Sequence, residues 1–181
     1  MEKEIDKSKI AKFSTRLGAY LTDALVIGLF SIAINYWNII ELKSFTLYFI
    51  VAIVGILYKP LLEYYFGATI GKYALDLKVK NENLDKIDLL QSFKRSSLFL
   101  IAPVLLIPIQ YLAFNNPEIN QLDSFMEFST SVQIYYPIQA VITNISVAII
   151  VVDLIFMLTD HKKMLRSLHD RIGKTLVIMD K

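Results

Sequence analysis

Four ionisable side chains stand inside otherwise apolar stretches of this sequence and could handle ions or protons: Asp23, Lys59, Glu63 and Asp153. Asp23 is the single charged residue between Leu17 and Trp37. An ionised carboxylate near the centre of a bilayer costs roughly 2.5 to 3.5 kcal/mol, so Asp23 needs a partner or a function. Arg16 lies about 10 Å away along a helix axis, too far for direct pairing. We therefore expect other helices to supply the partners of Asp23.

The composition predicts an all-α membrane protein. The 181 residues are 55% hydrophobic with a mean hydropathy of +0.48, more apolar than a soluble helical bundle of this size needs. Residues 1–181 form a single domain with four predicted transmembrane helices, at about 17–37, 45–66, 97–114 and 134–158. The first apolar run lacks the short core and small-residue cleavage site of a signal peptide, so we expect it to be retained.

The basic residues are sorted along the chain and predict its orientation. Of the 19 lysines and arginines, 17 lie in the N-terminal segment up to Arg16, in the connection 67–96, or in the tail 159–181. Cytoplasmic loops carry the excess of Lys and Arg, so we expect both termini and the 67–96 loop in the cytoplasm.

The two longest predicted cytoplasmic segments carry signs of local structure. Leu75, Leu77 and Val79 alternate with polar residues, which is the period of a half-buried strand. A lone strand cannot satisfy its backbone, and we expect it to pair with 175–179 in a small two-stranded ribbon. Asp85 or Asp88 could cap a helix that runs into the third span.

The extracytoplasmic connection 115–133 and the fourth span also carry a polar pattern. We expect a short interfacial helix at 123–128 within that connection. In the fourth span, polar residues follow one another at steps of four, three and seven, which draws one stripe along the helix that should face other helices. The stripe consists of Gln139, Thr143, Ser146 and Asp153.

The four intramembrane charges fall at similar depth. With the predicted orientation, Asp23, Lys59, Glu63 and Asp153 all belong to the cytoplasmic third of the bundle, where a shared cavity open to the cytoplasm would place them. In that arrangement Asp23 and Asp153 would exchange a proton for a small hard cation bound by their oxygens. The alternative is that Lys59 pairs with Glu63 one turn away and the acids only fix helix packing.

Several segments together resemble the RDD family of membrane proteins, which is named for one arginine and two aspartates. Arg16-Leu17-x-Ala19-Tyr20-x-x-Asp23 is similar to the family's first helix, and Gly67-x-Thr69-x-Gly71-Lys72 is similar to its central motif. Arg95, Leu168-His169-Asp170 and Thr175-x-Val177 match its later positions. Gly173-Lys174-Thr175 departs from the family's usual Ala-Gly-Thr.

The resemblance implies a bacterial cytoplasmic membrane protein. Some members are described as monovalent cation/proton antiporters, which implies Na⁺, K⁺ or Li⁺ and protons as ligands. Four spans make a narrow bundle, so transport would require a homo-oligomer. Asp170 would be the second aspartate of the family name, and we expect it to cap a backbone or to pair with Arg16 or Arg95.

A non-transport alternative stays open, and several other functions are disfavoured. In the alternative, the chain is a membrane scaffold or assembly partner that acts through its cytoplasmic loop and tail. The chain has no cysteine, and its two histidines, His161 and His169, have no neighbouring triplet of acids at metal-ligand spacing. Gly173-Lys174-Thr175 lacks the earlier glycine of a phosphate-binding loop. We therefore expect no enzyme activity, cofactor, metal site or nucleic-acid partner.

Overall fold

The computed structural model of the chain describes residues 9–160 and 164–180. His161, a histidine of the sequence analysis, lies outside the described residues. The long helices are α1 (Phe13–Trp37), which continues through the π-helical turn η2 (Asn38–Leu42), α2 (Phe45–Phe66), α4 (Leu89–Phe114) and α7 (Ile138–Leu158). The shorter elements are α3 (Ile70–Ala74), β1 (Leu77–Asn81), α5 (Pro117–Asn120), α6 (Phe125–Tyr135), α8 (Leu168–Gly173) and β2 (Thr175–Met179).

Four helices are long and apolar enough to cross a membrane, which confirms the predicted fold class. They are Phe13–Leu42, Phe45–Phe66, Leu89–Phe114 and Ile138–Leu158. Their outer faces expose large apolar side chains such as Leu29, Phe30 and Val54. A surface of this kind is stable in lipid and would aggregate in water.

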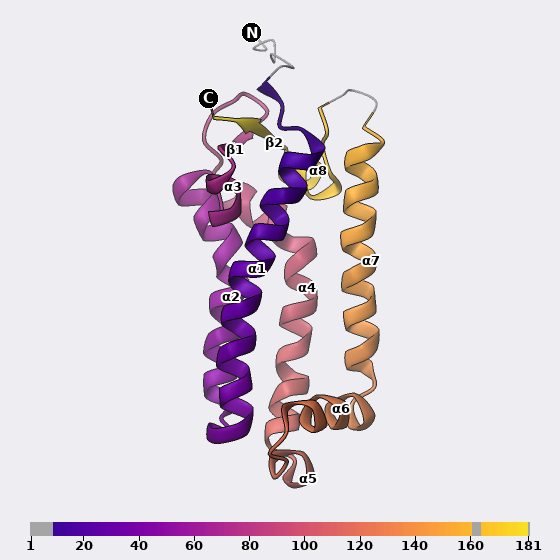
Figure 1. Cartoon of the computed structure of the whole chain (residues 1–181). Coiled ribbons are helices and arrows are strands. Elements are labelled where there is room, and N and C mark those ends of the chain that lie inside the picture. Colours follow the sequence, from indigo (N-terminus) through magenta and orange to yellow (C-terminus); the bar gives the residue numbers. More distant parts are fainter. Residues whose placement is uncertain (1–8, 161–163, 181) are drawn as a thin grey trace.

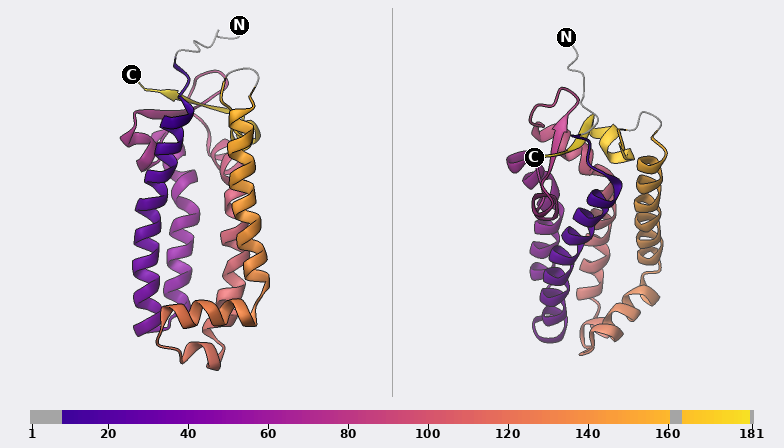
Figure 2. Two further views of the ribbon diagram at one scale, coloured as in Figure 1. Left: turned by 45° about the vertical axis from the view of Figure 1, so that its right-hand side comes forward. Right: turned by 45° about the horizontal axis from the view of Figure 1, so that its top comes forward.

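The four long helices run side by side as a bundle, and the shorter elements lie at the two ends of this bundle (Figure 1). The two strands, α3, α8 and the start of α1 lie at one end, which we call the basic end because the described parts of the predicted cytoplasmic segments gather there. At the opposite end, α6 lies crosswise to the long helices, with α5 beside it (Figure 2).

The predicted ribbon at the basic end is confirmed. β1 and β2 pair antiparallel, with Leu77 opposite Met179 and Asn81 opposite Thr175. The N-terminal segment joins them, because Ile10 bridges to Ile178. The buried side chains beneath the ribbon form one apolar cluster of Ala11, Ala19, Leu77, Val79, Ile87 and Val177. The chain's beginning, middle and end are thereby fixed to one another.

The third long helix starts earlier than its apolar residues indicate. We expected this span at 97–114, whereas α4 begins at Leu89. Asp88 forms a capping box with Gln91, which satisfies the first backbone donors of the helix. Hydropathy is weak over this extension because polar residues interrupt its apolar ones, but the predicted cap at Asp88 is confirmed, and the extension places Ser92 and Arg95 on the helix.

The other boundaries differ less. The second span matches its expected range, and the first begins four residues early, at Phe13. The fourth begins at Ile138 rather than at 134, because residues 134 and 135 complete α6. The interfacial helix that we expected at 123–128 is α6, at Phe125–Tyr135. It packs Phe128 and Val132 into an apolar cluster with Ile109, Ala113 and Phe114 of α4.

Candidate functional site

The candidate site is built around Asp170, at the start of α8. Ser167 and Asp170 form a capping box, in which each side chain bonds the other residue's backbone N–H. The Asp170 carboxylate also pairs with Arg16 of α1, at 2.5 Å, and with Arg95 of α4. Asp170 therefore combines the two roles that the sequence analysis gave as alternatives, capping a helix and pairing with arginines from other helices.

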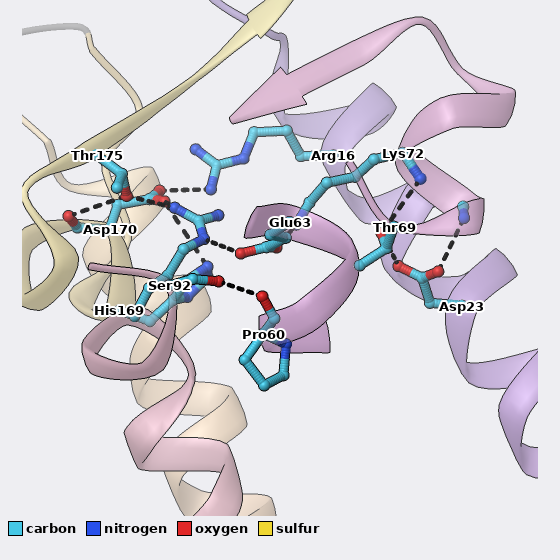
Figure 3. A network of polar contacts seen from close by, with 12 residues as sticks. Arg16, Asp23, Pro60, Glu63, Thr69, Lys72, Ser92, His169, Asp170 and Thr175 are labelled. Carbon is cyan, nitrogen blue, oxygen red and sulfur yellow. Dashed lines mark hydrogen bonds and ion pairs between the residues drawn. The ribbon is translucent and has the colours of Figure 1, made fainter. Parts of the chain in front are cut away.

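Arg95 connects this acid to a second one on α2. Its side chain is fully buried, and its Nε lies 2.9 Å from Glu63 Oε2. Lys72 of α3 pairs with the other oxygen of Glu63. We call the five residues Arg16, Glu63, Lys72, Arg95 and Asp170 the ionic network; Figure 3 shows part of it.

The pairing of Glu63 differs from the alternative that we considered for the sequence. The expected partner of Glu63 was Lys59, one turn away on the same helix, whereas its partners are Lys72 and Arg95. Lys59 instead places its ammonium 4.4 Å from the centre of the Phe99 ring. Glu63 is fully buried within the network.

Asp23 fixes the central motif to α1. Its Oδ2 accepts a hydrogen bond from Thr69 Oγ1 at 2.6 Å, and its Oδ1 accepts from the Gly71 N–H at 2.8 Å and from Tyr58 Oη at 2.7 Å. Gly67 ends α2 in the left-handed conformation, with φ of 72°, and so turns the chain toward Asp23. Through these hydrogen bonds the Asp23 carboxylate holds the start of α3 against α1 (Figure 3).

Asp153 holds His169. Its Oδ1 accepts from the His169 backbone N–H at 2.8 Å, and its Oδ2 lies 2.7 Å from His169 Nδ1. Burial, together with the cations Lys59 and Arg95, lowers the pKa of His169 to about 3. The ring is therefore neutral at physiological pH, and a proton on Nδ1 points to Asp153.

Two residues of the ionic network, Asp170 and Lys72, lie outside the spans, and burial and their partners shift their pKa values. Burial alone would raise the pKa of Asp170, but Arg16 and Arg95 hold it well below its usual range. Burial lowers the pKa of Lys72, and the neighbouring Glu63 carboxylate opposes this shift. Asp170 therefore stays ionised at any pH at which the protein would function.

A cavity of about 350 Å³ lies between these groups. Asp23, Lys59 and Asp153, from three different spans, all line it, whereas Glu63 is buried in the ionic network. Its walls toward the middle of the bundle are apolar, with Ile27 of α1 and Ile150 of α7. Three of the four intramembrane charges thus share one cavity, and their role in ion binding stays a prediction.

A model of the RDD family matches residues 10–174. The chain belongs to the RDD family. It is accordingly a membrane protein with four apolar spanning helices. No curated protein and no solved structure shows significant similarity to it.

The RDD motif residues meet at the basic end. The arginine and the second aspartate, Arg16 and Asp170, pair with each other, and the first aspartate, Asp23, binds the central motif. Thr175 joins the network, because Arg95 Nη1 lies 2.5 Å from its hydroxyl. The motifs are far apart in the sequence, and they meet because the separate elements that carry them pack on one another.

The departure at Gly173-Lys174-Thr175 has a structural reason in part. A Cβ on Gly173 would lie 2.8 Å from Cβ of Arg95, so glycine lets α8 pack closely on α4. Lys174, at the usual glycine position, adopts the left-handed conformation with φ of 51° and ends α8. Lysine tolerates this conformation less well than glycine.

Two residues of the site, Ser167 and Tyr58, were not predicted from the sequence. Ser167 stands three residues before Asp170, a spacing that indicates a capping box and could have been recognised. Tyr58 binds Asp23, but one tyrosine in an apolar helix gives no signal of a polar partner.

Substituting Gly71 by alanine tests the close packing of α3 on Asp23 and Ala19 of α1. The added Cβ would lie 2.1 Å from the carbonyl oxygen of Ala19 and 3.0 Å from Cγ of Asp23. We expect Gly71→Ala to lower the free energy of unfolding by about 1 to 3 kcal/mol. Thermal unfolding in mild detergent measures it. Gly28→Ala in α1 is the control, because its Cβ would meet nothing within 4 Å; equal effects of both substitutions would contradict the close packing of α3 on α1.

Stability should fall below neutral pH because of His169. Its pKa is about 3 in the folded chain, against about 6.5 unfolded, so the unfolded state binds the extra proton between these values. This share of stability is complete above pH 6.5 and falls by about 2 kcal/mol at pH 5. Asp170, whose pKa is depressed, loses its share only below about pH 4.

Unfolding midpoints between pH 7 and pH 5 measure this effect. His169→Gln should remove most of the fall, since glutamine keeps an amide donor for Asp153 and does not titrate. A wild-type midpoint that stays constant over this range would mean that His169 is solvated or charged when folded.

Proposed function

We propose that this RDD protein exchanges a monovalent cation, Na⁺, K⁺ or Li⁺, for a proton across a bacterial cytoplasmic membrane, without enzymatic chemistry. In this proposal the basic end faces the cytoplasm, Lys59 carries the proton, and Asp23 and Asp153 supply oxygen ligands to the cation.

The observation that supports this function best is the state of Lys59. Arg16, Lys72 and Arg95 each have a carboxylate partner in the ionic network. Lys59 faces the same cavity with an aromatic ring beneath it, and no carboxylate of the described residues comes within 4.0 Å of its nitrogen. Its charge is the least compensated one in the site.

Charge balance then assigns the proton. In ionised form, the acids Asp23, Glu63, Asp153 and Asp170 balance the cations Arg16, Lys59, Lys72 and Arg95. A cation that enters the cavity raises the total by one, which is costly in a medium of low dielectric constant. Loss of one proton restores neutrality, arginine cannot release one, and Lys72 is paired. Lys59 is the remaining donor.

The two carboxylates keep capacity for a cation. Each oxygen of Asp153 accepts one hydrogen bond from His169, and Asp23 Oδ2 accepts one from Thr69, whereas a carboxylate oxygen has two lone pairs. Pro103 of α4 also lines the cavity and frees the carbonyl of Phe99 from its helical hydrogen bond. Carboxylate and carbonyl oxygens are the ligands that hard cations prefer.

A second cavity, of about 240 Å³, continues the same interhelical space toward the opposite end. Neutral polar groups line it, among them Ser31, Asn35, Gln110 and Gln139. Along α1, Ile27 of the first cavity and Ser31 of the second are one turn apart, about 6 Å. Along α4, Pro103 and Gln110 are seven residues apart, about 10 Å, as are Ser146 and Gln139 along α7. A barrier of one to two helical turns between two cavities suits a carrier that opens to each side in turn.

The scaffold alternative finds less support. It would use the central motif and the Leu-His-Asp tail as a surface for a partner, but Thr69, Gly71, His169 and Asp170 are buried within the chain. Their side chains or backbone groups bind other parts of the same molecule.

Proteoliposomes test the proposal. A Na⁺, K⁺ or Li⁺ gradient should change the internal pH, and Lys59→Arg should reduce this change to the level of protein-free liposomes, because arginine keeps the charge but cannot release the proton. Asp153→Asn should do the same by removing a ligand. Lys72→Arg is the matched control: it preserves the ion pair with Glu63, and we expect it to retain exchange.

One-for-one exchange is electroneutral. With Na⁺ as the cation, the rate should not respond to an imposed membrane potential. A flat pH trace from folded wild-type protein would reject the exchange function, and an active Lys59→Arg variant would reject Lys59 as the proton carrier.

A further inference from the structure

The outward face of α7 carries a regular seam that the described residues 9–160 and 164–180 leave exposed. Its residues follow one another at alternating steps of three and four, and all are exposed: Val141, Asn144, Ala148, Val151, Ile155 and Leu158. This spacing keeps one side of a helix toward a partner helix, as in a left-handed coiled coil.

The seam is distinct from the polar stripe that the sequence predicts on the same helix. Gln139, Ser146 and Asp153 point inward, since they line the two cavities. Asn144 differs from Ser146 by two residues, which is about 200° around a helix. Asn144 therefore faces away from the cavities, toward the surrounding lipid.

Asn144 is a polar side chain exposed on the outward, apolar face of a predicted membrane span. It lies six residues into α7, about 9 Å from the helix start, among apolar residues. Within the described part of the chain, its side-chain amide makes no hydrogen bond. Two other polar residues of the spans bond their own helices: Thr143 donates to the Gln139 carbonyl at 2.9 Å, and Asn35 to the Ser31 carbonyl at 2.8 Å.

An amide that lacks a partner in hydrocarbon is costly, because neither lipid nor water can bond it there. A second copy of the chain can. The amide is both donor and acceptor, so two Asn144 side chains related by a two-fold axis satisfy each other. Ala148, one turn along the seam, is small enough for the backbones to approach closely.

We infer that the protein forms a two-fold dimer in the membrane through the α7 seam, with the two Asn144 amides hydrogen-bonded across the axis. The helices are parallel by symmetry and cross at about 20°. Each protomer keeps its own cavities on the other side of α7. The dimer thus does not depend on the exchange function, and a dimer would persist in a protein that exchanges no ions.

Cysteine cross-linking in liposomes tests the seam directly, because the chain contains no cysteine of its own. Single cysteines at Val141, Ala148, Val151 and Ile155 should form disulfide-linked dimers on mild oxidation. Ile145→Cys and Val147→Cys are the matched controls, since both positions are exposed on α7 but lie on either side of the seam. Equal cross-linking at seam and control positions would overturn the proposal.

The amide pair has its own test. Asn144→Leu should weaken the dimer about three- to thirty-fold, measured by energy transfer between labelled copies as lipid dilutes them. The side chain is exposed, so this change should leave the monomer's unfolding midpoint unaltered. Thr143→Val, next to it but bonded within its own helix, should change dimerisation little. A monomeric wild type, or a dimer indifferent to Asn144→Leu, would refute the inference.

Discussion

Everything at the basic end depends on the pairing of buried charges with one another. Arg95 is fully buried, and its guanidinium would be very costly there without the two acids, Glu63 and Asp170, that bind it from opposite elements. Those acids in turn bring Lys72 and Arg16 with them. Removing any one member would leave a buried charge uncompensated, so the network specifies how α1, α2, α3, α4 and α8 meet. Its worth lies in this specificity, since apolar packing could provide equal stability.

The network also explains why the remaining charges can act otherwise. Asp23 is held by hydroxyl and amide donors, and Asp153 by a neutral histidine, so neither is bound to a fixed cation. Lys59 lies over an aromatic ring rather than against a carboxylate. The ion-paired network thus borders a cavity that is also lined by Asp23, Lys59 and Asp153, none of which is in an ion pair with lysine or arginine among the described residues. Aspartate and lysine occur in both groups, so it is the partners of each residue, and not its type, that separate the two groups.

The sequence predicts the parts of this fold that follow from local pattern. The length of the apolar runs predicts the four spans, and the alternation of apolar and polar residues predicts β1. Because only one other segment has the character of a strand, the pairing of β1 with β2 could also be predicted. Pairing across the bundle was less accessible. Glu63 has Lys59 one turn away on its own helix, and local spacing favours that pair, but Lys72 and Arg95 reach Glu63 through tertiary packing. The cap at Asp88 was one of the two predicted starts of the helix that leads into the third span, whereas hydropathy alone placed the span eight residues later, because polar residues interrupt 89–96.

Asn144 illustrates the opposite limit. In the sequence it is one more polar residue in the fourth span, beside a stripe with an evident period. Only the direction of the helix faces separates it from Gln139, Ser146 and Asp153, which line the cavities. A polar residue that faces inward in such a bundle can be explained by the chain alone. Asn144 faces outward on an apolar seam and has no hydrogen bond in the described part of the chain, and its self-complementary amide is the reason that we propose a second copy as its partner.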